Sequence, residues 1–156
     1  MVMKISESGL SAIRQREELR LKAYKCQAGV WTIGWGHTSG VTAGMVITEE
    51  QAQAFLAADL QPIEAFLNRE GYRGLKQNQY DALVSLIFTL GTLKYSRSTL
   101  RRLIKAGAPA KDCAAQFLKW KYYTDRATGE KKISQGLVNR RDSEAKQYMG
   151  CYDESY

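Results

Sequence analysis

The chain is 156 residues long, with 44% hydrophobic and 25% charged residues. This length and balance predict one globular domain with its own core, and they exclude wholesale disorder. No apolar run is long enough to span a bilayer, and the first 20 residues contain no signal-peptide core, so we expect synthesis in the cytoplasm. Lys and Arg outnumber Asp and Glu by 23 to 16, and the net charge of +7 favours anionic partners: nucleic acid, anionic lipid or a cell wall.

The three cysteines are too few and too widely spaced for a disulfide framework. With a single histidine, the chain also lacks the paired Cys or His spacing of a structural zinc site. We therefore expect reduced thiols at Cys26, Cys113 and Cys151 and no metal site.

The first predicted helix begins at Ser6, a residue type that caps helices. Leu10, Ile13 and Leu21 recur at helical spacing, and Glu17 falls in the same narrow stripe. This spacing predicts a carboxyl group on the buried face of the helix, where desolvation raises its pKa and suits it to general acid catalysis. The alternative is a structural acid at the helix end. Its predicted ion-pair partners are Arg14, Arg20 and Lys22.

The next segment, residues 24–47, is rich in glycine and predicts a small antiparallel sheet with tight turns. In its strand 30–35, period-two alternation places Thr32 on the same face as Gly34 and Gly36. The Thr32 hydroxyl is then expected over a floor without side chains, which suits a polymer or sugar. The alternative is a hairpin that needs glycine for its backbone geometry. His37 ends the strand, and for a lone histidine a structural role competes with a catalytic one.

The rest of the chain is predicted to be helical. A capping box at Thr48 starts a helix that runs to about Asn68, with a kink or break at Pro62. Further helices are predicted over residues 80–90, 98–106, 111–123 and 134–148, with a polar loop at 124–132. We interpret residues 1–156 as one α+β domain, with an N-terminal lobe over about 10–60, a connecting helix and a helical C-terminal lobe over about 70–150. A cleft between the lobes is the expected ligand site.

These segments resemble the phage-type lysozymes, the endolysins of glycoside hydrolase family 24. Residues 17–26 (EELRLKAYKC) and 29–38 (GVWTIGWGHT) are similar to the family patterns E-G-x-R-x-x-A-Y-x-D and G-x-x-T-I-G-Y-G-H-T. The similarity continues in order through residues 40–41, 47–48, 77–84, 98–100 and 136–141. The resemblance implies a two-lobed lysozyme-like fold and a muramidase that hydrolyses the β-1,4 bond between N-acetylmuramic acid and N-acetylglucosamine in peptidoglycan.

The family uses a Glu, an Asp and a Thr for catalysis, and the resemblance assigns the Glu to Glu17 and the Thr to Thr32. The Asp position holds Cys26, a thiol that is only a few per cent ionised at pH 7 at its ordinary pKa of about 8.5. A thiolate is still a strong nucleophile, and the basic neighbours Lys22 and Lys25 favour its ionisation. We therefore expect a muramidase with reduced or altered activity.

The family motifs also suggest substrate-binding residues. These are His37, Phe88, Thr89 and Ser98. Two smaller departures accompany Cys26: Glu18 replaces a Gly, which is expected to disturb packing, and Thr89 replaces Asn or Gln, which is expected to alter a hydrogen bond in the cleft.

Two other functions compete with an active muramidase. One is a catalytically impaired homologue that still binds peptidoglycan, and the other is a Cys/His hydrolase that pairs Cys26 with His37. In every case we expect bacterial peptidoglycan as the partner, no cofactor and a monomer that stays in the host cytoplasm until it is released to the wall. Nucleic-acid binding is expected to be non-specific, because basic residues are spread along the chain without a reader motif.

Overall fold

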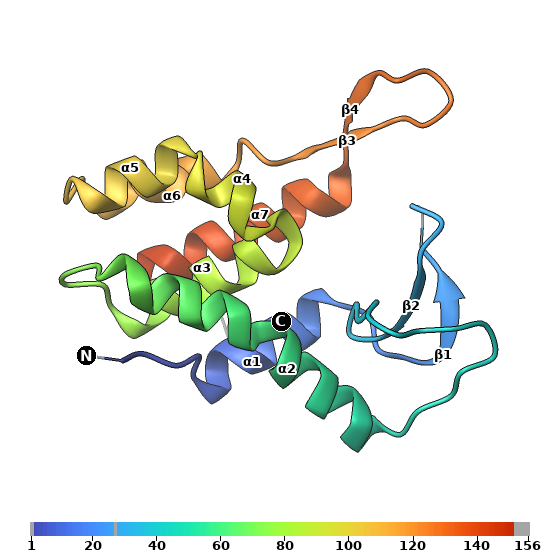
Figure 1. Cartoon of the computed structure of the whole chain (residues 1–156). Coiled ribbons are helices and arrows are strands. Elements are labelled where there is room, and N and C mark those ends of the chain that lie inside the picture. The colour runs from blue at the N-terminus through green and yellow to red at the C-terminus, as the bar shows by residue number, and fades with distance from the viewer. Residues whose placement is uncertain (1, 27, 152–156) are drawn as a thin grey trace.

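A computed structural model describes residues 2–26 and 28–151. Over these residues the chain forms helices and two short antiparallel hairpins (Figure 1). The elements in chain order are α1 (Glu7–Arg16), β1 (Arg20–Lys25), β2 (Trp31–Gly34), α2 (Glu49–Glu70), α3 (Gln77–Leu90), α4 (Thr92–Ser96), α5 (Thr99–Lys105), α6 (Ala110–Phe117), β3 (Tyr122–Thr124), β4 (Lys131–Ile133) and α7 (Gln135–Met149).

The central element is α3, which packs against α1, α2, α4 and α7. Its residues 80–87 are all buried, so this helix is apolar on nearly every side. A helix that is hydrophobic all round must be surrounded by other elements. The sequence prediction of a core helix over 80–90 is thereby confirmed, and α3 is the scaffold on which the first and last helices are aligned.

Helix α1 begins as predicted, because the Ser6 hydroxyl accepts the Gly9 N–H. A second anchor comes from α3: Asp81, which is buried, accepts hydrogen bonds from the backbone N–H and the hydroxyl of Ser6. The prediction that the helix extends to Leu21 is wrong. The helix ends at Arg16, and Leu21 lies in β1 with an exposed side chain.

The predicted small sheet is confirmed, since β1 pairs antiparallel with β2. The predicted floor of Thr32, Gly34 and Gly36 is wrong. Gly34 has a φ of 64°, which ends the extended backbone, and period-two alternation stops there. Gly34 then lies against Ala52 of α2, whereas Gly36 lies against Glu17.

Helix α2 begins with the predicted capping box, in which Thr48 and Gln51 bind each other's backbone N–H groups. It continues without a break through Pro62 to Glu70, slightly beyond the predicted end. Its N-terminal half packs against β2 and its other buried residues pack against α3. This helix therefore joins the sheet to the helical part of the molecule (Figure 1).

The C-terminal region differs from the uniformly helical prediction. Helix α6 ends at Phe117 rather than at Tyr123, and residues 122–133 form the β3–β4 hairpin instead of a helix end and a polar loop. The predicted helix starts at Ser98 and Ser134 are confirmed, and in the structure these serines are the N-caps of α5 and α7. Among the described residues, no helix is both long and apolar enough to cross a membrane.

Candidate active site

Glu17 is the first residue after α1, and its backbone N–H still donates to Ile13 at the helix end. Its side chain is 22% exposed, and Oε1 accepts a hydrogen bond of 2.6 Å from Nη1 of Arg140 on α7. The prediction of an acid packed only against apolar side chains is therefore wrong. The structure brings Glu17 to a basic residue 123 positions away rather than to the sequence neighbours considered as alternatives.

The second oxygen of Glu17 lies close to Gly36. A Cβ on Gly36 would lie 3.6 Å from Oε2 of Glu17 and 3.8 Å from the ring of Phe88. Gly36 has a φ of 77°, so the turn also needs glycine for its conformation. Oε2 of Glu17 and the edge of the Phe88 ring therefore both lie beside Gly36.

Cys26 directly follows β1, in the turn that leads to β2. Its N–H donates to the carbonyl of Val30 at 3.0 Å, and its carbonyl accepts the N–H of Gly29 at 2.8 Å. A hydrogen bond from the backbone of Val30 is the main cause that lowers the pKa of the thiol; desolvation opposes it, and weaker hydrogen bonds from Ala28 and Thr32 lower the pKa further. The turn therefore favours the thiolate more than a free cysteine does.

Thr32 is buried, and its hydroxyl donates to the carbonyl of Val30 at 3.0 Å. The same hydroxyl is one of the hydrogen-bonding groups that lower the pKa of Cys26. A hydroxyl has a single proton, so it can serve the Val30 carbonyl or the thiolate at any one time. Thr32 therefore supports Cys26 from inside the sheet and does not project over an open surface.

Tyr24 lies close enough to both Glu17 and Cys26 for their charges to affect its pKa. Burial raises its pKa, the charge of Arg20 opposes this, and the charges of Glu17 and Cys26 raise it further. Both acids thus act on one phenol, and they lie in the same neighbourhood of β1. The charge of Glu18 also raises the pKa of Tyr24, but Glu18 lies at the surface. Its side chain is 74% exposed and pairs with Arg20 at 3.3 Å, so it does not disturb the packing as expected.

Arg140 is held by a buried network that the sequence prediction did not include. Its Nε donates to Glu144 at 3.3 Å, and its Nη2 donates to the carbonyl of Ser85 at 3.3 Å. Glu144 is fully buried and also accepts hydrogen bonds of 2.5 Å from Arg141 and from the Ser85 hydroxyl. The i,i+4 spacing of Arg140 and Glu144 on one helix is a signal that was present in the sequence.

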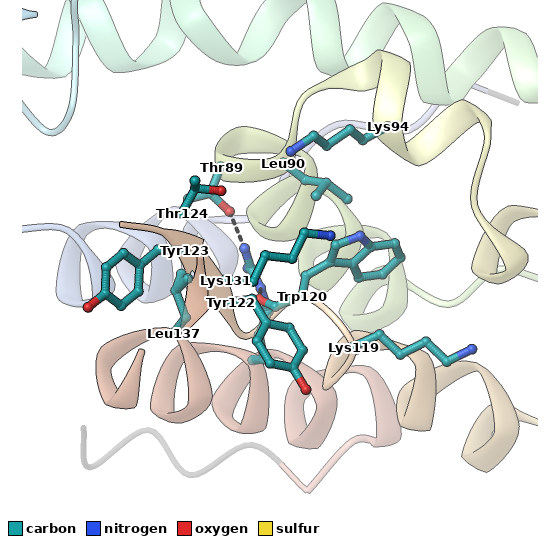
Figure 2. Close-up of a pocket in the computed structure, with 11 residues that line it drawn as sticks. Thr89, Leu90, Lys94, Lys119, Trp120, Tyr122, Tyr123, Thr124, Lys131 and Leu137 are labelled. Carbon is teal, nitrogen blue, oxygen red and sulfur yellow. Dashed lines mark hydrogen bonds between the residues drawn. The ribbon is translucent and has the colours of Figure 1, made fainter. Parts of the chain in front are cut away.

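Thr89 lies on the wall of a second feature, a pocket of about 290 Å³ between the end of α3, Trp120 and the β3–β4 hairpin (Figure 2). Its hydroxyl donates to Leu86 at 3.1 Å and accepts a hydrogen bond of 2.7 Å from Arg141, drawn as the dashed line in Figure 2. Through this hydrogen bond Thr89 attaches α3 to α7. The expected effect of Thr89 on a hydrogen bond in the substrate cleft stays a prediction. The other residues that line the pocket are Leu90, Lys94, Lys119, Tyr122, Tyr123, Thr124, Lys131 and Leu137.

Two predicted substrate-binding residues are buried and make packing contacts in the structure. His37 is buried, its Nδ1 lies 2.9 Å from Asp59 on α2, and its ring stacks on Phe55 with centroids 4.2 Å apart. Ser98 is the buried N-cap of α5, where its hydroxyl donates to Tyr95 at 2.6 Å and accepts from Arg101. These contacts favour the structural interpretation of His37.

The comparison with known families decides the identity of the fold. The model of the family described as Phage lysozyme matches residues 14–144, a span that includes Glu17, Cys26, Thr32 and Arg140. The chain belongs to the phage lysozyme family. The resemblance seen in the sequence motifs is thereby confirmed.

Relatives and solved structures agree with this assignment. An endolysin of Acyrthosiphon pisum secondary endosymbiont phage 1 is 44% identical over 142 residues, which are 91% of this chain and 95% of the relative. The structure of an endolysin from Escherichia coli O157:H7 phage FAHEc1 is 38% identical, covers 97% of both chains and has a TM-score of 0.89. The muramidase domain of SpmX from Asticaccaulis excentricus is 34% identical, covers 94% of this chain and 97% of its own, and has a TM-score of 0.86. The predicted α+β fold of the lysozyme type is confirmed.

Proposed function

We propose that this phage lysozyme is an endolysin-type muramidase in which Glu17 is the general acid and Cys26, supported by Thr32, replaces the usual aspartate. The substrate is bacterial peptidoglycan, cleaved between N-acetylmuramic acid and N-acetylglucosamine. Support for this function comes from the family and from the endolysin relatives. The observation that carries the residue roles is the position of Glu17, with one oxygen bound by Arg140 and the other beside Gly36.

The general acid must deliver a proton to the oxygen of the leaving sugar. Arg140 occupies Oε1 of Glu17 at 2.6 Å, so Oε2, beside Gly36 and Phe88, is the oxygen that can carry this proton to a substrate. Arg140 fixes the orientation of the carboxyl group, since an arginine hydrogen bond is directional. Phe88 provides an apolar edge for the sugar ring in the same space.

The second role is to provide negative charge near the anomeric carbon, where positive charge develops in the transition state. The Cys26 thiolate carries this charge when ionised, and its lowered pKa increases the ionised fraction at neutral pH. The Thr32 hydroxyl stabilises the thiolate through a hydrogen bond. The anomeric configuration of the released sugar distinguishes attack by sulfur, which retains the configuration, from attack by water, which inverts it.

The remaining expectations follow from this assignment. A Cys/His hydrolase loses its support, because the hydrogen bonds of His37 go to Asp59. Monomeric action without a cofactor stays a prediction, and the net charge of +7 suits an anionic wall reached from the host cytoplasm.

The test is the release of new reducing ends from purified peptidoglycan. The parent is expected to release ends on N-acetylmuramic acid, and Glu17→Gln is expected to release none, because it keeps the shape of the side chain and removes the proton. Glu18→Gln is the matched control at an exposed neighbouring acid and should behave like the parent. Binding to peptidoglycan without any release of ends would favour the impaired homologue instead.

A further inference from the structure

We propose that Glu144 is a positioning residue for the general acid, acting through Arg140; this inference rests on the proposed role of Glu17. Glu144 has no exposed surface, although a buried carboxylate is costly unless it is fully paired. It lies on α7, and its hydrogen bonds go to Arg140, Arg141 and Ser85, none of which is assigned to substrate binding. Its contacts instead hold the arginine that binds Glu17.

The hydrogen bonds around Glu144 form a closed ring with the end of α1. Arg16 donates to the Ser85 hydroxyl at 3.0 Å, and that hydroxyl donates to Glu144 at 2.5 Å. Glu144 accepts from Arg140, and Arg140 donates to Glu17, the residue that follows Arg16 in the chain. The ring therefore links Glu17 to the buried Glu144 carboxylate through Arg140, whereas Arg16 also binds α7 directly through Ser143 and Gln147.

Arg140 needs this support because its guanidinium group binds three acceptors at once. Nη1 reaches Glu17, Nη2 reaches the Ser85 carbonyl and Nε reaches Glu144. A side chain held at three points keeps one rotamer, and the fork of a guanidinium group allows this where a lysine does not. Glu144 is the buried counter-ion that Arg140 and Arg141 share. If Glu144 loses its charge, Arg140 is held less firmly, and its hydrogen bond to Glu17 is no longer fixed in direction.

The first test measures turnover of purified peptidoglycan. We expect Glu144→Gln to lower kcat about 10-fold or more with KM within about twofold of the parent, because misplacement of a catalytic group affects the chemical step. The matched control is Asp142→Asn, which removes an acid from the same helix at a half-exposed site paired with Lys146, and it should leave both constants unchanged. A kcat for Glu144→Gln within about twofold of the parent would overturn the proposal.

The second test asks whether the effect passes through Arg140. In an Arg140→Lys background, Glu144→Gln should lower kcat much less than in the parent, because residues that act through one another are not additive. An equal fold-change in both backgrounds would overturn the proposal. Since loss of one buried charge can unfold the chain, Glu144→Asp is the second variant. It keeps the charge but shortens the side chain, and a kcat equal to that of the parent would also count against positioning.

A third readout does not depend on turnover. The Nε–H proton of Arg140 should exchange slowly with solvent in the NMR spectrum of the parent and of Asp142→Asn, and quickly in Glu144→Gln or Glu144→Asp. Unchanged exchange in the Glu144 variants would overturn the proposal. A parent that shows slow exchange but no release of reducing ends would count against the proposed function and not against the role of Glu144 toward Arg140.

Discussion

Arg126 of the β3–β4 hairpin donates a hydrogen bond of 2.9 Å to the carbonyl of Ala28, in the turn that follows Cys26. The two residues are 98 positions apart, and Figure 1 shows the hairpin (orange) projecting from the helical part on the same side as β1 and β2. A Cβ on Gly29 would lie 3.6 Å from the same guanidinium group. The hairpin is therefore attached to the turn that shapes the environment of Cys26.

The attachment predicts that Arg126→Ala loosens this turn. The N–H of Gly29 donates to the carbonyl of Cys26, so its hydrogen exchange reports directly on the turn. We expect exchange at Gly29 to become several-fold faster, with little change in the helices, as measured by NMR. Lys111→Ala, at an exposed position on α6, is the control. Exchange at Gly29 that is equal in the parent and Arg126→Ala would show that the contact does not order the turn.

The close approach of α1 to α3 predicts that Gly9→Ala is destabilising. A Cβ at Gly9 would lie 2.6 Å from Cγ of Asp81, a buried side chain that is fixed by Ser6. We expect a loss of about 1–3 kcal/mol in the free energy of unfolding, which lowers Tm by about 2–4 °C per kcal/mol. The control is Gly136→Ala on α7, where the nearest atom is an ordinary 3.7 Å away. Thermal unfolding that is unaffected by Gly9→Ala would contradict the tight packing.

The different environments of two thiols predict selective alkylation. Cys113 is buried and its pKa is raised by burial, whereas the pKa of Cys26 is lowered chiefly by the hydrogen bond from Val30. With the exposed Cys151 replaced by Ser, we expect iodoacetamide to modify Cys26 at least about 10-fold faster than Cys113. The rate at Cys26 should rise with pH to a midpoint below that of free cysteine measured under the same conditions, because a lowered pKa ionises the thiol at lower pH. A midpoint above that value would contradict the assigned environment.

Local signals in the sequence were sufficient for most of the fold. The cap at Ser6, the capping box at Thr48 and the apolar run of α3 each predict an element that the structure contains. The end of α1 was missed because Leu21 continues the helical spacing by chance, although it lies in a strand. The β3–β4 hairpin was missed because its pairing of Tyr122 with Ile133 is not local.

The site was only partly predictable for the same reason. Family motifs predict Glu17, Cys26 and Thr32 as the catalytic set, and Thr32 lies close enough to Cys26 to help lower the pKa of its thiol. The ion pair between Glu17 and Arg140 spans 123 positions, and nothing in the spacing of either helix predicts it. His37 illustrates the opposite error: it lies inside a family motif, yet its contacts with Asp59 and Phe55 belong to the packing of α2 against the sheet.

The central claim is that ionised Cys26 performs the role of the usual aspartate, and the pH dependence of peptidoglycan hydrolysis by Cys26 variants tests it most directly. We expect Cys26→Ser to be inactive, because a hydroxyl does not ionise in this pH range. Cys26→Asp should exceed the parent at pH 6–7, since a carboxylate is already ionised there. The parent should gain activity relative to Cys26→Asp as pH rises and the thiol ionises. A Cys26→Ser variant as active as the parent, or a Cys26→Asp variant no more active than Cys26→Ser, would contradict the account.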